Sequence, residues 1–429
     1  METPRPEARA AGVQAIDGRD RAAGSLSHLP VLDGLRGTAI LLVIVYHCWG
    51  INPPVVNSLD HVVKLVAEIG WSGVQLFFVL SGFLITGILL DSKDGRNYFR
   101  NFYVRRVLRI FPLFYAVLAI YLVGAAVLPH HFRPPLGIAA GQEAWYATFL
   151  SNFSMARLHD MAPSTLGVSW SLAVEEQFYL VWPLVVWLLP RRWLLRLCLT
   201  LFFVSFFWRL ALTVGGVAPL VTSLLTPSQF GGLAVGSALA VWQRQAGGVR
   251  QLVPWARRLL LAVPPLILAI GIQAGDPTQG RHLMVTVGLL LVQGFFGACV
   301  VLVLAGHLGP RLLASAPLRA CGRWSYGMYL FHTILLQIYF ALPGRGFWPL
   351  LFGAALPKQL LVTAGTILAS AAVAALSWNL YERPFLRLKR FFPMNSGRER
   401  VRAGAGSEAL GGLPVELEPI PAEQTRTPS

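Results

Sequence analysis

The stretch VLDGLRGTAILLVIVYHCWG, residues 31–50, places an arginine and a histidine at the two ends of an apolar run. Arg36 and His47 are eleven residues apart, which in an α-helix corresponds to about three turns and roughly 16 Å. Both side chains therefore project from nearly the same face of one helix. Because such an apolar run is typical of a membrane span, the stretch predicts a transmembrane helix with an ionisable group near each end.

The composition of the whole chain predicts a polytopic membrane protein. Of its 429 residues, 55% are hydrophobic and 13% are charged, whereas soluble domains average about 25% charged residues. The apolar residues gather in runs of about twenty, the length that crosses a bilayer as a helix. We predict an all-α fold with about ten transmembrane helices, over residues 35–51, 74–90, 107–128, 169–189, 194–214, 224–242, 259–273, 283–306, 324–342 and 357–378.

The basic residues predict the orientation of these helices. If the ten spans alternate in direction, 29 of the 36 lysines and arginines fall on one side of the membrane. Cytoplasmic loops carry such an excess, so we expect both termini in the cytoplasm. The net charge of +16 does not indicate nucleic-acid binding, because the basic residues separate apolar runs and do not gather on one soluble face.

Two polar tails are expected to flank the membrane domain. Residues 1–30 are rich in arginine and lack the apolar core of a secretory signal, and residues 391–429 are rich in glycine, proline and glutamate. We expect both to be disordered cytoplasmic tails around a transmembrane domain over residues 31–390. The cysteines lack metal-binding spacing, so we expect small buried residues and no metal site: Cys48, Cys198, Cys299 and Cys321.

Ionisable residues inside membrane spans are costly and point to function. Arg36 and His47 suit a substrate that spans the bilayer, with an anionic group at the arginine and a reacting centre at the imidazole. The alternative is that Arg36 anchors the helix at the cytoplasmic surface and His47 is a hydrogen-bonded histidine at the interface. In GVSWSLAVEEQFYLVWPL (167–184), Ser171, Glu175 and Tyr179 share one helical face.

A buried Glu175 would need a partner such as His47 or a substrate hydroxyl, unless it lies at a wet helix end. The stretch NYFRNFYVRRVLRIFPLFY (97–115) interleaves arginines with aromatic residues. These arginines suit either lipid headgroups or the phosphates of a soluble cofactor. Among the lesser candidates, we expect Asp33 to cap its helix or pair with Arg36, His332 to be structural, and Glu382 to pair with Arg383 or Arg387.

Six motifs follow one another along the chain. They are LDGLRG with Arg36 and His47, FFVLSGFLITGILL (77–90), FYVRRVLRIFPLFY (102–115), SWSLAVEEQFYLVWPL (169–184), GRWSYGMYLFHTILL (322–336) and YERPF (381–385). In this order they resemble acyltransferase family 3, the membrane O-acyltransferases that modify carbohydrates and other hydroxyl compounds. The resemblance covers about residues 30–390.

The resemblance implies specific roles for matching residues. Arg36 and His47 match the family's essential pair, with His47 as the catalytic base, and Glu175 matches the acidic residue of an SxxxExxFY motif. Arg105, Arg106 and Arg109 match a basic cytoplasmic segment that would hold the phosphates of acyl-CoA together with Arg36. In one departure, Gln229 stands where members often carry an arginine.

The resemblance therefore predicts an O-acyltransferase in a bacterial inner membrane. It would move an acyl group, expected to be acetyl, from the co-substrate acyl-CoA to a hydroxyl of a glycan or other acceptor, with no permanently bound cofactor. His47 would act as base or acyl carrier, and Glu175 would orient either its imidazole or the acceptor. The expected substrate contacts are Ser171, Tyr179 and Trp170.

Two other functions fit parts of the sequence. A secondary transporter or exporter of an organic anion or lipid-linked glycan is compatible with ten spans. It is disfavoured because the chain has no evident internal repeat and no paired broken helices. A receptor or scaffold would leave the depth of His47 unexplained.

Overall fold

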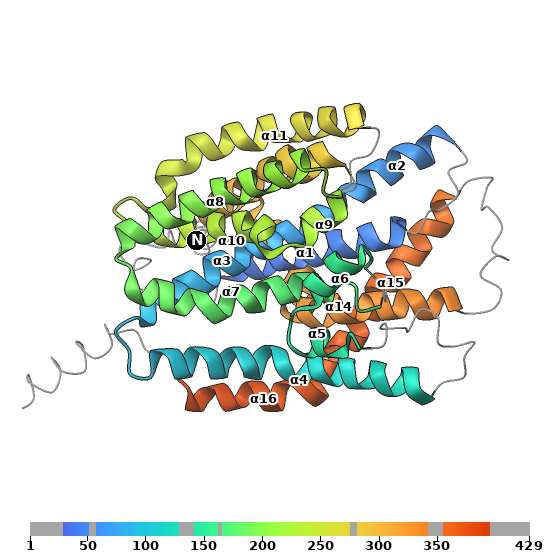
Figure 1. The fold of residues 1–429 in the computed structure, drawn as a ribbon, viewed down its shortest axis with the longest axis horizontal. Coiled ribbons are helices and arrows are strands. Elements are labelled where there is room, and N and C mark those ends of the chain that lie inside the picture. Colours follow the sequence, from blue (N-terminus) through green and yellow to red (C-terminus); the bar gives the residue numbers. More distant parts are fainter. Residues whose placement is uncertain are drawn as a thin grey trace, which may run out of the picture.

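Ten long helices form a bundle in the computed structural model, which describes residues 29–50, 57–127, 141–161, 165–274, 281–341 and 355–394 (Figure 1). No strand occurs in these ranges. The long helices are α1 (Pro30–Trp49), α3 (Gly73–Ser92), α4 (Tyr98–Val127), α7 (Ser169–Leu188), α8 (Arg191–Val214), α10 (Thr226–Trp242), α11 (Val253–Ala274), α12 (Leu289–Leu304), α14 (Ala316–Ala341) and α15 (Leu356–Ser377).

Shorter helices connect and extend the long ones. They are α2 (Ser58–Glu68), η3 (Ile69–Ser72), α5 (Glu143–Ala147), α6 (Ser151–Leu158), α9 (Pro219–Leu224), η5 (Gly248–Leu252), η6 (Met284–Gly288), α13 (Pro310–Leu313), η8 (Trp378–Glu382), α16 (Arg383–Arg387) and η9 (Leu388–Phe391). The expected tails 1–30 and 391–429 lie almost entirely outside the described residues.

Every predicted span corresponds to one long helix, so the all-helical fold class is confirmed. Seven helical segments in the described ranges are long and apolar enough to cross a membrane, which indicates a multi-pass membrane protein. The other three long helices are α7, α10 and α14. The largest shift is in α4, which begins at Tyr98 and not at residue 107, because its first three turns are rich in arginine and escape a search for apolar runs.

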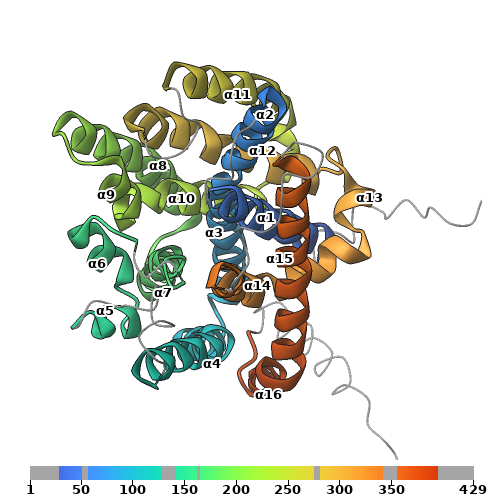
Figure 2. The ribbon, with the colours of Figure 1, turned by 90° about the vertical axis from the view of Figure 1, so that its right-hand side faces the viewer.

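Close helix contacts at glycine residues bring α1 against α13 and α14. A Cβ atom at Gly34 would overlap the carbonyl of Leu313, and a Cβ at Gly37 would overlap that of Leu318. From the opposite side, a Cβ at Gly322 would overlap the carbonyl of Asp33. Small residues allow such backbone approach between membrane helices. The glycines of the LDGLRG motif therefore fix the position of α1, which lies near the middle of the bundle (Figure 2).

Helix α3 packs against α10 in the same way. A Cβ at Gly82 would overlap the carbonyl of Leu233, and one at Gly236 would overlap that of Val79. Three of the four cysteines are buried and unbridged, and Cys321 is partly buried, as the sequence predicted. Helices α8 and α11 lie at the side of the bundle (Figure 2) and expose apolar side chains such as Phe203 and Leu261.

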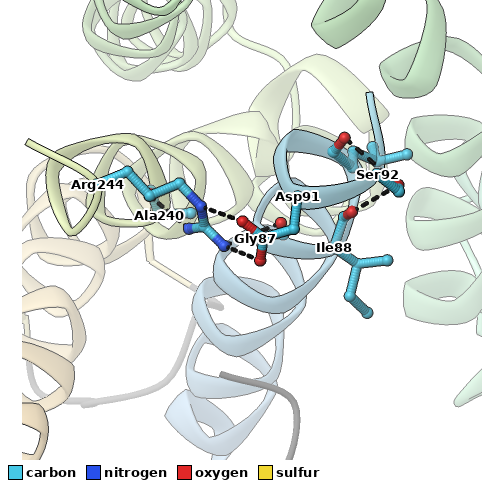
Figure 3. A network of polar contacts seen from close by, with 7 residues as sticks. Gly87, Ile88, Asp91, Ser92, Ala240 and Arg244 are labelled. Atoms are coloured by element: carbon cyan, nitrogen blue, oxygen red, sulfur yellow. Dashed lines mark hydrogen bonds and ion pairs between the residues drawn. The ribbon is translucent and has the colours of Figure 1, made fainter. Parts of the chain in front are cut away.

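An arginine clamp joins α3 and α10 where both helices end (Figure 3). Arg244 donates hydrogen bonds to both oxygens of Asp91, at 2.8 and 2.5 Å. It also donates to the carbonyls of Gly87 and Ala240, at 2.9 and 2.8 Å. We call this end of the bundle, which also holds the start of α4 and η9, the basic end.

We expect Gly236→Ala to destabilise the protein, because the added methyl group would force α3 and α10 apart. Overpacking of this kind costs about 1–3 kcal/mol. Gly294→Ala on α12 is the matched control, since its added methyl group would meet no atom of the described residues within 4 Å. Thermal unfolding in detergent should show a lower midpoint for Gly236→Ala alone. Equal midpoints for the two variants would contradict the packing explanation.

Candidate active site

Helix α1 holds Arg36 toward the basic end and His47 toward the opposite end. Arg36 lies 3.7 Å from Asp33 Oδ1, which confirms Asp33 as its partner. The Arg36 charge is also close enough to act on Glu175 of α7 and on Arg106 and Arg109 of α4. The half-exposed Arg36 therefore lies within electrostatic range of these charged groups.

His47 meets a second histidine, His332, on the neighbouring helix α14. Nδ1 of His47 lies 3.3 Å from Nε2 of His332, and the two rings are 4.9 Å apart in an edge-on arrangement. His332 is fully buried. The sequence assigned it a structural role and gave no reason to place it beside His47.

Hydrogen-bond partners fix which nitrogen of each ring carries the proton. Nδ1 of His332 lies 3.0 Å from the carbonyl of Met328, so it donates there and its Nε2 accepts. Nδ1 of His47 lies 2.8 Å from the carbonyl of Val43 and also faces His332 Nε2. Both partners are acceptors, so Nδ1 of His47 carries the proton. Its Nε2, which makes no hydrogen bond to any described residue, then has a free lone pair.

The polar face of α7 links the histidines to the charged interior. Ser171 Oγ is 2.6 Å from the hydroxyl of Tyr329, and the Tyr329 ring packs 5.8 Å from His332. Two turns further along, the hydroxyl of Tyr179 hydrogen-bonds to Ser81 of α3. Glu175, between Ser171 and Tyr179, interacts with Ser81, Tyr179 and the charges of Arg36 and Arg106. The three residues predicted to share a face thus all point toward neighbouring polar groups.

The three arginines of α4 that were predicted to hold phosphates lie in different environments. Arg106 lies over the rings of Phe102 and Tyr179, at 5.7 and 5.8 Å. Arg109 lies over Trp378, at 5.0 Å, and 3.5 Å from Glu382 Oε2.

The third arginine, Arg105, donates hydrogen bonds to the carbonyls of Lys389 and Phe392, at 3.1 and 3.2 Å.

The ion pair of Arg109 identifies the partner of Glu382. Glu382 is buried and pairs with Arg109, so the predicted pairing with Arg383 or Arg387 is wrong. The π-helical turn of η8 carries Glu382 inward.

A pocket of about 180 Å³ opens between α3, α4 and the segment after α16. Its cationic lining comes from Arg105, Arg106 and Lys389, and its remaining lining includes Asp91 and the apolar side chains of Phe83, Leu84, Ile88, Phe102 and Met394. Arg36 and Arg109 are not part of this lining. The structure therefore places two of the four expected phosphate ligands in one pocket.

Two other predicted residues are buried. Trp170 packs against Phe78, with ring centroids 6.1 Å apart. Gln229 accepts a hydrogen bond from Gln75, at 2.8 Å, and donates one to the carbonyl of Ser223, at 2.5 Å. Gln75 in turn accepts from Gln293, at 3.1 Å. Gln229 therefore belongs to a buried amide network between α3, α10 and α12.

Sequence reasoning missed Lys389 and the partner role of His332. Tyr329 and His332 stand one turn apart in SYGMYLFH, which was a usable signal for a polar face of α14. Lys389 gave no signal, because its neighbours Arg387 and Arg390 suggested an ordinary basic end of a helix. Arg209 on α8 was also missed. It is fully buried and donates to Ser205 Oγ and the carbonyl of Ser228, at 2.8 and 2.6 Å.

We expect Glu382→Gln to destabilise the protein by about 3 kcal/mol, because it leaves Arg109 without its counter-charge in a buried site. The double variant Arg109→Met/Glu382→Leu should recover part of this loss, since it removes both charges. Asp33→Asn, at a half-exposed ion pair, is the control with little expected effect. A thermal midpoint unchanged by Glu382→Gln would show that the buried pair contributes nothing.

The sequence matches a known protein family over most of its length. The family model, described as an acyltransferase domain, matches residues 29–378. This range contains Arg36, His47, the arginines of α4, the polar face of α7 and His332. No solved structure matches.

Several bacterial proteins are similar to the chain. The peptidoglycan O-acetyltransferase OatA of Listeria monocytogenes is 29% identical over 333 residues, which cover 73% of this chain and 50% of that protein. The putative peptidoglycan O-acetyltransferase YrhL of Bacillus subtilis is 29% identical, over 83% of this chain and 55% of that protein. The chain thus spans about half the length of the relatives it matches. With the family model matching residues 29–378, the chain belongs to acyltransferase family 3.

Proposed function

We propose that this protein transfers an acyl group, acetyl in the simplest case, from acyl-CoA to a hydroxyl of a glycan or other acceptor. The observation that carries the proposal is the His47–His332 pair, which leaves Nε2 of His47 unprotonated and without a hydrogen bond to any described residue. Two of the similar proteins are named for O-acetylation of peptidoglycan, and this supports a glycan acceptor and an acetyl group.

The cationic pocket at the basic end supports acyl-CoA as the donor. The planar guanidinium group of arginine can donate two hydrogen bonds to one phosphate group. Arg105 and Arg106 line a pocket whose other walls are largely apolar. The donor's phosphates would bind there, with Arg36 and Arg109 contributing their charges from outside the pocket lining. Soluble acyl-CoA is cytoplasmic. In this proposal the basic end and both termini therefore face the cytoplasm, and all ten long helices cross a bacterial inner membrane.

His47 would move the proton of the reaction. In direct transfer, Nε2 of His47 takes the proton of the acceptor hydroxyl while the hydroxyl oxygen attacks the thioester carbonyl. The C–S bond then breaks, and the CoA sulfur takes the proton from His47. In the two-step route, Nε2 attacks the thioester first, an N–C bond forms and the CoA thiolate leaves. The oxygen of the acceptor hydroxyl then attacks the acyl carbon, the N–C bond to Nε2 breaks, and the hydroxyl proton passes to the CoA thiolate. Both routes need the tautomer that His332 and Val43 favour.

The polar face of α7 would hold and orient the acceptor. Ser171 and Tyr179 supply hydroxyl groups, and Glu175 supplies a carboxylate that orients the acceptor or the imidazole. Trp170 would need a rotation away from Phe78 to stack on a sugar ring. The family relationship does not favour the transporter alternative.

We expect His47→Ala to abolish acyl transfer while the protein still inserts and purifies as a folded species. The reason is that both routes pass through Nε2 of this residue. Transfer of radiolabelled acetyl groups from acetyl-CoA to an isolated peptidoglycan or glycan acceptor in membrane vesicles measures the loss. Wild-type turnover by the variant would remove His47 from the mechanism.

We expect His332→Phe to lower kcat by about ten- to a hundredfold with little change in KM, because Phe cannot accept a hydrogen bond from Nδ1 of His47, which leaves the carbonyl of Val43 to hold that proton and orient the ring alone. His332→Gln should retain more activity, since its amide oxygen can accept that bond. Steady-state kinetics of the two variants separate this role from packing. An equal loss in both variants would point to packing alone.

A further inference from the structure

We infer that residues 388–394, which follow α16, form a wall of the donor pocket, and that Lys389 supplies the third cation of a phosphate-binding site there. This inference rests on the proposed acyl-CoA-dependent function and extends it. We call residues 388–394 the C-terminal strap.

The strap is held in place by the start of α4. Arg105 donates to the carbonyls of Lys389 and Phe392, and Asn101 donates to the carbonyl of Pro393, at 2.8 Å. Arg100 lies 5.4 Å from the centre of the Phe392 ring. These contacts come from the first turns of one helix, so they fix the strap along its length. Arg105 is therefore a positioning residue for the strap as well as a part of the pocket wall.

The strap brings Lys389 into a group of like charges. Lys389 is close enough to interact with the charges of Arg105, Arg106 and Arg109. Glu382 also faces Lys389, but it is paired with Arg109. Within the described ranges, neither Lys389 nor Arg106 has a carboxylate within ion-pair distance. Cations this close repel one another, and a bound phosphate would offset the repulsion.

The arginine clamp keeps the pocket cationic. Asp91 is the acidic residue of the pocket lining, and both of its oxygens accept hydrogen bonds from Arg244 (Figure 3). Held in this way, Asp91 does not neutralise Arg105 or Arg106 across the pocket. The remaining walls are apolar, which strengthens the attraction between the cations and an anion. The pocket therefore fits a phosphate group, from either the nucleotide end of CoA or the headgroup of an anionic lipid.

Binding of CoA to the full-length protein in phosphatidylcholine nanodiscs tests the inference. We expect Lys389→Met to weaken CoA binding about tenfold, and Lys389→Arg to bind CoA within about twofold of the wild type. Arg390→Met is the matched control, because Arg390 is the neighbour on the same strap and lies over Phe391. Dephospho-CoA measures whether the 3′-phosphate occupies the site: a smaller effect of Lys389→Met on its binding would place that phosphate at Lys389. An equal effect would place the diphosphate there.

Several outcomes separate this inference from the proposed function. If the wild type binds CoA and Lys389→Met binds it as well as Arg390→Met does, the inference fails and the donor assignment stands. If Lys389→Met instead weakens only the binding of phosphatidylglycerol, the site belongs to a lipid headgroup and the inference also fails. If CoA binds with the expected Lys389 dependence but acetyl-CoA supports no transfer, the phosphate site stands and the proposed function fails. Thermal unfolding of each variant confirms that it is folded.

Discussion

Charged side chains lie inside this bundle because they face one another and not the surrounding apolar surface. Arg109 pairs with Glu382, Arg106 lies between aromatic rings beside α7, and Glu175 interacts with Arg36 and Arg106. An isolated charge at membrane depth would be costly, so each of these groups constrains the helix that carries its partner. The helices that bear them, α1, α4, α7 and η8, must therefore assemble in one arrangement, and this arrangement sets the position of every candidate catalytic group.

The contact between α1 and α14 links helix packing to the position of the candidate catalytic histidine. The glycines at positions 37 and 322 let the two backbones touch, and this contact continues along the helices to the opposite end, where His47 meets His332. A bulkier residue in the LDGLRG motif would separate the helices and weaken the hydrogen bond between His47 and His332. The motif thus acts on the histidine pair through the fold, at a distance of several helical turns.

The sequence predicted the positions of the helices better than the contacts between their side chains. Apolar runs located all ten long helices, because the hydrophobic effect acts on composition, and helical spacing placed Ser171, Glu175 and Tyr179 on one face. Contacts between helices far apart in the chain could not be derived: the sequence does not show that His332 reaches His47 or that Lys389 returns to α4. The partner of Glu382 was wrong for the same reason, since nearby arginines in the sequence were preferred over Arg109, which is close only in the folded protein.

The most direct test of the account is a cryo-electron microscopy structure of the protein with a non-hydrolysable acetyl-CoA analogue. The account predicts phosphate density beside Arg106 and Lys389, and an acyl end that extends past Arg36 toward Nε2 of His47, where reacting atoms would lie within about 3.5 Å. An analogue whose acyl end points away from His47, or whose phosphates lie outside the cationic pocket, would contradict it.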